Sequence, residues 1–277
     1  MRGQSYGGGS APTAASAAWT VSRRPAFVIA PLGADFPVGE FQGNVDFSLS
    51  PVVAEESNRF LVENDGDSYV LSARDYLTLP ESWVFPLVGH LHVSCRGGVE
   101  FLSALAAARY RTASIDVMQP SLCRLGEGIS AAAVNAGFLF CNRLEWEMIR
   151  ALHVPLPRHL FVLRTDAEGV DVMLGGDSLR VASVSVDPSM IVSTVGAGDS
   201  FLGGFLAAFV AGGALSVSLN AGIAAATTAV QGFGPSDLLS AHEQVSELRA
   251  QLDEKRVYRF PSAIVRRFAK LQDQVQL

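Results

Sequence analysis

The sequence is short of cysteines and of charged residues, and both shortages narrow what the protein can be. Cys95, Cys123 and Cys141 lie far apart and form no C-x-x-C pair, so neither a disulfide framework nor a cysteine zinc site is indicated. We expect reduced core thiols in a cytoplasmic protein. Charged residues make up 17% of the chain, the net charge is −6, and the basic residues form no long cluster. No nucleic-acid partner is expected, because phosphate contacts need a concentrated basic surface.

Charge is missing altogether from Phe201 to Ser236, a stretch long enough to be compared with a membrane span. Glycines and polar side chains interrupt it, and "AGGALSVS" in its middle indicates a break between two helices that are each too short to cross a bilayer. The N-terminal segment also lacks the continuous apolar core of a signal peptide. We therefore expect two buried helices of a soluble protein, and no membrane as a partner.

The 277 residues are 49% hydrophobic, enough for one large α/β domain or two small ones. After residue 84, apolar segments such as "LHVSC" and "FLFCN" alternate with helical segments such as "RLEWEMIRAL". This alternation predicts βαβ units and a mostly parallel sheet covered on both faces. "RRPAFVIAPLG" (23–33) is typical of a buried strand, and residues 43–79 are typical of a small antiparallel sheet with an Asp-Gly turn.

The segment "MIVSTVGAGDSFLGGF" has the order strand, glycine turn, helix, and ligands of parallel sheets bind at such turns. A turn of Gly196, Ala197 and Gly198 leaves backbone N–H groups open to an anion at the helix start, where the helix dipole favours negative charge. Asp199 beside it could accept the proton of an alcohol during phosphoryl transfer. The alternative is that Asp199 only caps the helix.

"VSTVGAGDSFLGGFLAAF" resembles the C-terminal signature D-T-x-G-A-G-D of the PfkB/ribokinase family of sugar and nucleoside kinases. The G-A-G-D core matches Gly196 to Asp199, and the resemblance implies that Asp199 is the catalytic base and that Gly196, Ala197 and Gly198 form the anion hole. "FLFCNRLEWEMI" is similar to the family's N-x-x-E segment, which implies that Asn142 and Glu145 lie near Mg²⁺ and the phosphates. By themselves, these two residues would be a cap and a surface helix residue.

Weaker matches follow the family's order along the chain. "GGGSAPTAASAA" resembles the glycine motif that holds the sugar, with Gly8, Gly9 and Thr13 as its substrate-binding positions. "RTDAEG" lies where the family has the nucleotide stretch T-x-G-x-x-G, of which Gly169 is kept. "NAGIAAATTAVQGFGP" fits the helix and loop beside the adenine, which implies nucleotide contacts at Gly232 and Gly234. Outside the family context, Gly8 and Gly9 would simply form a turn.

The resemblance implies a three-layer α/β/α ribokinase-like domain with a β-lid. We expect the domain at residues 1–42 and 80–262, the lid at 43–79 and a C-terminal tail at 263–277. The glycine motif is reached by residue 7, so we expect either that the family's first strand lies upstream of Met1 or that this protein lacks it. An exposed sheet face invites cover, and we therefore expect any homodimer to form through the lid.

The implied activity is transfer of the γ-phosphoryl group of Mg·ATP to a hydroxyl of a small sugar, sugar acid or nucleoside. The chain departs from the family pattern at several positions. Ser193 stands where the signature has its first Asp, and Thr13 stands where the glycine motif has a sugar-binding Asn. Arg164 and Asp166 replace residues of the nucleotide stretch, and only Asp116 is kept of the D-x-N-x-R motif. Ser193 argues against activation by a monovalent cation. Together the departures motivate an alternative, a degenerate member that acts as a nucleotide or sugar sensor or as a structural partner.

Two histidines in "GHLHVS" are the remaining candidates for a metal site. We place His90 and His92 on opposite sides of their strand and therefore expect no metal pair there.

Overall fold

The structure is a computed structural model. It describes residues 10–41, 43–57, 60–62, 69–71, 77–80, 83–95 and 108–276. Internal contacts divide the chain into two compact units, and each is described by itself. The first unit comprises Met1–Glu81, Val186–Ala208 and Val217–Lys255, and the second comprises Ser82–Ser185, Phe209–Ser216 and Arg256–Leu277.

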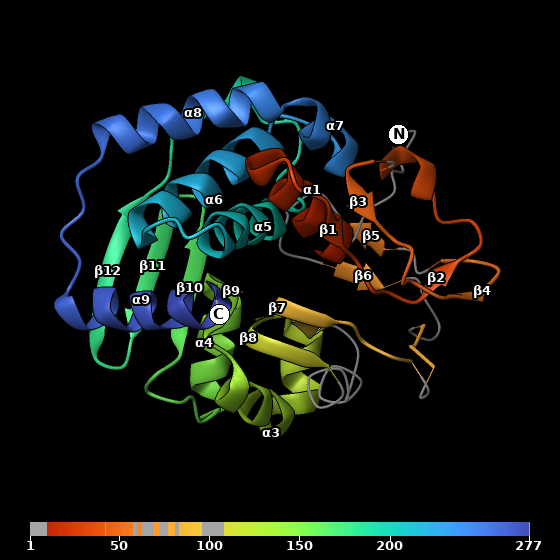
Figure 1. The fold of residues 1–277 in the computed structure, drawn as a ribbon, viewed down its shortest axis with the longest axis horizontal. Coiled ribbons are helices and arrows are strands. Elements are labelled where there is room, and N and C mark those ends of the chain that lie inside the picture. The colour runs from red at the N-terminus through yellow and green to blue at the C-terminus, as the bar shows by residue number, and fades with distance from the viewer. Residues whose placement is uncertain are drawn as a thin grey trace. The chain divides into compact units, whose positions relative to one another are not determined.

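The second unit is built on one six-stranded sheet with the strand order β12-β11-β10-β9-β8-β7 (Figure 1). Its strands are β7 (Leu87–Cys95), β8 (Arg109–Val117), β9 (Phe138–Asn142), β10 (Phe161–Asp166), β11 (Gly169–Leu174) and β12 (Asp177–Ala182). The strands β7 to β10 pair in parallel, and β11 and β12 return antiparallel. The predicted mostly parallel sheet is therefore confirmed.

Alternation along the strands gives this sheet two apolar faces. Leu139 and Cys141 of β9 belong to a buried cluster with side chains of α3 (Gln119–Asn135) and α4 (Arg143–Ala151). Phe138 faces the other way, where its ring lies 4.9 Å from that of Phe209 and 6.1 Å from that of Phe268. Apolar residues on both faces are what a sheet covered on both sides requires.

The expected C-terminal tail is instead a helix, α9 (Ser262–Gln276). Its buried side chains are Ile264, Phe268, Leu271 and Val275, spaced three or four residues apart on one stripe. Leu271 packs closely on Gly137, where an added Cβ would lie 3.0 Å from Leu271 Cδ2. The sequence expectation was wrong because the charged residues between these positions obscured the stripe.

The first unit carries the helices α1 (Ser10–Ser22), α5 (Ala197–Val210), α6 (Leu215–Ala229), α7 (Gly234–Ser240) and α8 (His242–Lys255). Within the described residues it also has three two-stranded sheets. They pair β1 (Ala26–Phe27) with β3 (Val45–Asp46), β2 (Leu32–Gly33) with β4 (Val52–Ala54), and β5 (Phe60–Val62) with β6 (Tyr69–Leu71). A short 3₁₀ helix, η1, spans Val38–Phe41.

The strand expected at residues 23–33 is thus two short pieces, β1 and β2. Both pair in parallel with segments of the 43–79 region, and only β5 and β6 form the predicted antiparallel hairpin. Ala30 separates the two pieces, and its N–H donates to Ser50 Oγ at 3.1 Å rather than to a strand neighbour. A side chain from a later part of the chain therefore interrupts the strand.

The uncharged run forms α5 and α6, separated by a turn that includes Gly212 with a positive φ of 84°. This confirms the prediction of two short helices. No helix in the described part of the chain is both long and apolar enough to span a membrane.

Two adjacent glycines let α5 approach its neighbours at backbone distance. A Cβ added at Gly203 would lie 2.0 Å from the Ala14 carbonyl oxygen of α1. One added at Gly204 would lie 2.7 Å from the Ala221 carbonyl oxygen of α6. The absence of side chains at these two glycines thus allows α5 to pack closely between α1 and α6.

Candidate functional site

The predicted strand "MIVST" before the glycine turn is absent. Its first residue ends a 3₁₀ helix, η2 (Pro188–Met190), and Ile191 to Thr194 form no strand. The N–H groups of Val192 and Ser193 both donate to the Val230 carbonyl, at 2.8 and 3.2 Å. The segment is therefore hydrogen-bonded to the residue after α6. Two N–H groups that would pair with a neighbouring strand in a sheet donate to this one carbonyl instead.

The glycine turn itself forms as predicted and leads directly into α5. Gly196 has a positive φ of 81°, a conformation that strongly favours glycine, and its carbonyl accepts the first helical hydrogen bond, from Ser200 N at 2.8 Å. Helix geometry leaves the amides of Gly198 and Asp199 without a carbonyl four residues back in α5. A Cβ at Gly198 would meet no atom within 4 Å, so this side of the turn is open.

Asp199 is held by a residue that the sequence analysis did not select. The hydroxyl of Ser10, the first residue of α1, donates a hydrogen bond to Asp199 Oδ1. One helical turn further along α1, Thr13 is buried against the turn, with its Cγ2 3.1 Å from the position of a Cβ at Gly196. The starts of α1 and α5 therefore meet, which brings the predicted positions Thr13, Gly196 and Asp199 together.

The signal for Ser10 was present in the sequence. It is the first hydroxyl after the glycine run "GGG" and the first residue of the helix. Gly8 and Gly9, the other predicted substrate-binding positions, lie outside the described residues.

Gly232 and Gly234 shape the turn between α6 and α7. Gly234 has a positive φ of 80°. A Cβ at Gly232 would lie 2.8 Å from Asp237 Cβ, and the N–H of Phe233 donates to Asp237 Oδ2 at 2.7 Å. Both glycines are thus required by a turn that Asp237 closes, and the turn leaves the ring of Phe233 exposed.

In the second unit, Asn142 and Glu145 form a reciprocal capping box at the end of β9. Asn142 Oδ1 accepts a hydrogen bond from Glu145 N at 2.8 Å, and Glu145 Oε2 accepts one from Asn142 N at 2.7 Å. The capping alternative is therefore confirmed for Asn142. Glu145 is not a surface residue, because only 7% of it is exposed. A buried carboxylate at the carboxyl end of a parallel strand remains a candidate ligand for a cation.

Cys141, next to Asn142, is a free, buried thiol. Burial raises its pKa well above the usual range, and the negative charge of Glu145 adds to this. The thiol is therefore protonated and inert, as predicted for a core cysteine. The side chains of Cys95 and Cys123 lie outside the described part of the structure.

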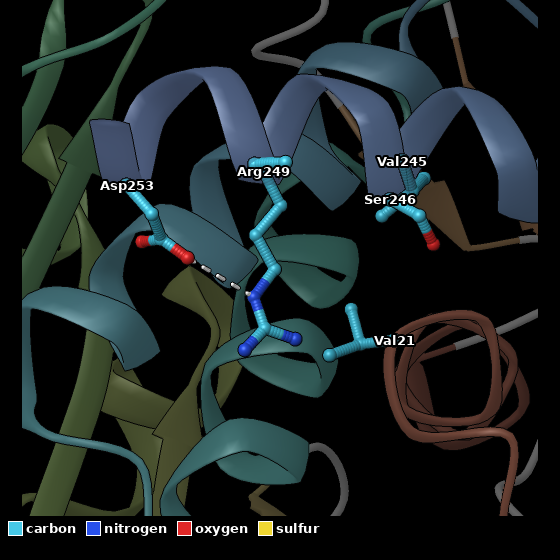
Figure 2. Close-up of a pocket in the computed structure, with 6 residues that line it drawn as sticks. Val21, Val245, Ser246, Arg249 and Asp253 are labelled. Carbon is cyan, nitrogen blue, oxygen red and sulfur yellow. Dashed lines mark ion pairs between the residues drawn. The ribbon is translucent and has the colours of Figure 1, made fainter. Parts of the chain in front are cut away.

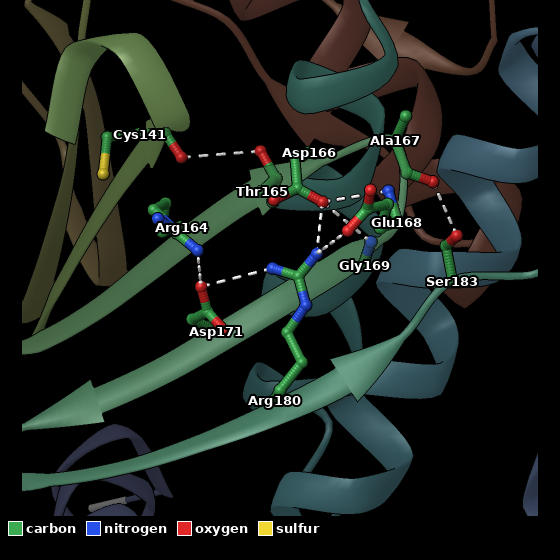
Figure 3. Close-up of polar contacts among 10 residues, drawn as sticks. All are labelled: Cys141, Arg164, Thr165, Asp166, Ala167, Glu168, Gly169, Asp171, Arg180 and Ser183. Carbon is green, nitrogen blue, oxygen red and sulfur yellow. Dashed lines mark hydrogen bonds and ion pairs between the residues drawn. The ribbon is translucent and has the colours of Figure 1, made fainter. Parts of the chain in front are cut away.

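Gly169 lies in the turn between β10 and β11, where Asp166 replaces a family glycine. Asp166 Oδ1 accepts hydrogen bonds from the N–H groups of Glu168 and Gly169, at 2.9 and 3.0 Å, and from the Arg180 guanidinium (Figure 3). Burial opposes ionisation, but Arg180 and the two amides outweigh it and lower the pKa of Asp166. The Asp166 carboxylate is thus hydrogen-bonded to two backbone N–H groups of its own turn.

The other departure, Arg164, belongs to the same network. Arg164 donates to Asp171 Oδ2 on the neighbouring strand, and Arg180 Nη1 donates to the same oxygen at 3.2 Å. The register places these three residues directly opposite one another across β10, β11 and β12 (Figure 3). The substitutions in the nucleotide stretch therefore form one ion-pair cluster.

The placement of His90 and His92 on opposite sides of β7 is wrong. Both rings contact the Ser114 hydroxyl at 2.9 Å, through His90 Nε2 and His92 Nδ1, and His90 Nδ1 lies 2.8 Å from Thr112 Oγ1. Residues two apart in a strand share a face, which the sequence reasoning overlooked. Burial, with the nearby His92, lowers the pKa of His90 to about 3. Nowhere in the described chain do three or more His, Cys, Asp or Glu side chains gather as a metal site.

Comparison with known proteins identifies the family to which this arrangement corresponds. The sequence model of the family described as pfkB family carbohydrate kinase matches residues 2–241. No curated protein sequence matches the chain significantly.

Solved structures share the fold at low sequence identity. Aminoimidazole riboside kinase from Salmonella enterica, complexed with aminoimidazole riboside and an ATP analog, is 18% identical with a TM-score of 0.70, over 87% of this chain and 91% of that chain. Ribokinase from Cryptococcus neoformans, in complex with ADP, is 20% identical with a TM-score of 0.71, over 89% and 92%. Fructokinase from Vibrio cholerae, bound to fructose, ADP and calcium ion, is 19% identical with a TM-score of 0.64, over 85% and 90%. The fold is therefore ribokinase-like α/β.

Proposed function

Because the chain belongs to the pfkB family of carbohydrate kinases, we propose that it transfers the γ-phosphoryl group of ATP to a hydroxyl of a small sugar, sugar acid or nucleoside. The observation that carries this proposal is the turn before α5, where an open glycine-rich helix start and the carboxylate of Asp199 lie side by side. The sugar and nucleoside ligands named for the similar kinases support the same range of acceptors.

Asp199 is the base of this reaction. Its carboxylate takes the proton of the acceptor hydroxyl while the hydroxyl oxygen bonds to the γ-phosphorus and the bond to the leaving ADP breaks. The hydrogen bond from Ser10 to Oδ1 keeps the carboxylate oriented. The amides of Gly198 and Asp199, at the positive end of the α5 dipole, stabilise the charge on the transferred group.

Glu145 is the residue that we propose to hold Mg²⁺, through water, with Asn142 keeping Glu145 in place by the capping box. One carboxylate together with water and phosphate oxygens is a ligand set that Mg²⁺ adopts in nucleotide sites, so the buried Glu145 fits the ion. Bound there, Mg²⁺ would offset the negative charge of the phosphates.

For the nucleotide, we assign contacts to Gly169, Gly232 and Gly234. The exposed ring of Phe233 between the last two glycines offers an apolar surface to an adenine. For the acceptor, we assign Thr13 together with Gly8 and Gly9. The buried Thr13 beside Gly196 supports an acceptor bound next to the turn.

The lid region supports association through its strands. Val52 of β4, in the lid, is 64% exposed, and Phe27 of β1, which pairs with β3 of the lid, is 61% exposed. Exposed apolar side chains of this kind favour an interface. A homodimer formed through the lid, in the cytoplasm, is the assembly that we propose.

The proposal is tested by measuring ADP release with a set of sugars, sugar acids and nucleosides, for the wild type and for Asp199→Asn. We expect at least one acceptor to be phosphorylated and the variant to lose at least about a hundredfold in kcat, the scale of general-base catalysis, with ATP binding retained. Asp187→Asn is the matched control, since Asp187 is exposed and only caps η2. Near wild-type turnover in Asp199→Asn would overturn the role of Asp199.

A second candidate is a nucleotide or sugar sensor without turnover. The observation that favours it is the occupation of the β10–β11 turn amides by Asp166. Calorimetry separates the two functions, because a sensor binds ATP or the acceptor with no ADP formed.

A further inference from the structure

A groove in the first unit lies apart from every residue assigned above. It has a volume of about 260 Å³, just below the roughly 300–1,000 Å³ of sites for drug-sized ligands. Its lining comes from α1 and α8, and consists of Val21, Val245, Ser246, Arg249, Ala250 and Asp253 (Figure 2). The groove is therefore shallow and below the size of such sites, so any ligand that it takes must be a small one.

Arg249 is the main polar group of this groove. Its Nε lies 3.6 Å from Asp253 Oδ2, four residues later on α8. Neither Nη of Arg249 has a hydrogen-bond partner among the residues that the structure describes, and the side chain is only 31% exposed. In Figure 2 the side chain extends from α8 between Asp253 and Val21, with its two terminal nitrogens pointing away from the helix.

Asp253 is held on its other side by Asn220 of α6, whose Nδ2 donates to Oδ1 at 2.7 Å. The carboxylate is thus engaged through Oδ1 by Asn220 and through Oδ2 by Arg249 Nε. This arrangement holds Arg249 at its Nε atom, and the two Nη atoms remain directed toward the groove.

The chemistry of the lining selects one class of ligand. The fork of a guanidinium matches the two oxygens of a carboxylate, which it binds through parallel hydrogen bonds. Val21 and Ala250 supply accessible apolar surface beside it, whereas Val245 is only 1% exposed. Asp253 places a negative charge close by, which weakens the binding of a dianion such as phosphate more than that of a monoanion.

We propose that this groove binds a small organic monocarboxylate, with its carboxylate on the Nη atoms of Arg249 and its carbon chain against Val21 and Ala250. The site is separate from the turn at Asp199, and none of its lining residues takes part in the proposed phosphoryl transfer. Its test is therefore independent of the proposed function.

The experiment is calorimetry on the full chain with three probes. These are 4-methylpentanoate, the neutral 4-methylpentanamide of the same shape, and inorganic phosphate. We expect the carboxylate to bind with a Kd on the order of 1 mM, and the amide and phosphate to bind at least about tenfold more weakly. No heat with the carboxylate at tens of millimolar, or equal binding of carboxylate and amide, would overturn the proposal, and tighter binding of phosphate would do the same.

Three variants locate the binding. Arg249→Gln should weaken carboxylate binding at least about tenfold. Lys255→Gln, which removes one positive charge from the last turn of the same helix outside the groove, should bind like the wild type. Ala250→Leu keeps the charge and narrows the groove at an exposed helical position, so it should also weaken binding and remains informative if Arg249→Gln fails to fold. Unchanged binding in Ala250→Leu, or in a folded Arg249→Gln, would contradict the site.

Discussion

The Ser10 hydroxyl donates a hydrogen bond to Asp199 Oδ1 across 189 positions of the chain. The donor is the first residue of α1 and the acceptor lies in the first turn of α5, so the bond joins two helix starts. It restrains the orientation of the carboxylate. In the proposed mechanism, the base that accepts a proton from one hydroxyl is thus positioned by another.

The first prediction concerns this bond. Ser10→Ala removes the donor, and we expect kcat to fall about tenfold with a smaller change in KM. The reason is that a hydrogen bond to a charged group is lost while the carboxylate itself remains. Steady-state kinetics with the acceptor found in the screen measures this.

Ser22→Ala is the control for Ser10→Ala. It is the same substitution at the far end of the same helix, where the hydroxyl donates to the backbone carbonyls of Ala18 and Arg24 and accepts from the N–H of Arg24. A fall in kcat of equal size in both variants would mean that the loss comes from α1 and not from the bond to Asp199.

Glu145→Gln separates the structural role of Glu145 from its role toward a metal. Glutamine also serves in a capping box, so the melting temperature should change little. The charge is lost, however, and we expect the Mg²⁺ concentration for half-maximal activity to rise about tenfold or more. A Mg²⁺ titration of activity checks this, with Glu147→Gln on the exposed side of α4 as the control. An unchanged Mg²⁺ requirement would remove Glu145 from the metal site.

His90 predicts a pH dependence of stability. Its pKa is about 3 in the folded protein against 6.5 for an ordinary histidine, so the unfolded chain binds the proton first as the pH falls. Stability from this group is complete above pH 6.5 and declines below it, by an amount on the order of 2 kcal/mol at about pH 5. Denaturant unfolding over this range should show a shallower decline for His90→Leu.

The glycines of the α5 segment differ in their tolerance of a methyl group. Gly203→Ala forces a Cβ toward the Ala14 carbonyl, and we expect it to cost about 1–3 kcal/mol of unfolding free energy. Gly198→Ala meets open space at the helix start and should leave that free energy nearly unchanged or slightly raised. Thermal unfolding of both variants measures the difference, and equal effects would contradict the packing at Gly203.

The sequence predicted those parts of the molecule that depend on short-range patterns. The glycine turn, the break between α5 and α6, and the parallel strands β7 to β10 all follow from spacing and composition. The "MIVST" strand failed because its amides bond to the Val230 carbonyl, a partner that no local pattern reveals. Ser10 was missed for the same reason, since its role depends on a residue far along the chain.

Other errors had causes within the sequence itself. His90 and His92 were assigned to opposite faces although their spacing of two places them on one. The charges of residues 262–276 concealed the apolar stripe of α9. Asp166 was recognised as a departure, but its capture of two amides and Arg180 depends on how β10, β11 and β12 pair.

The glycine pair of α5 has a consequence for motion. The backbones of α1 and α6 approach the two glycines of α5 directly. No flexible side chain therefore lies at these two contacts that could change its rotamer when one helix shifts against another. We therefore expect the three helices to move as one block. We expect a larger residue at Ala14 or Ala221 to push α5 away from its neighbour and so to displace Asp199, which lies in the first turn of that helix.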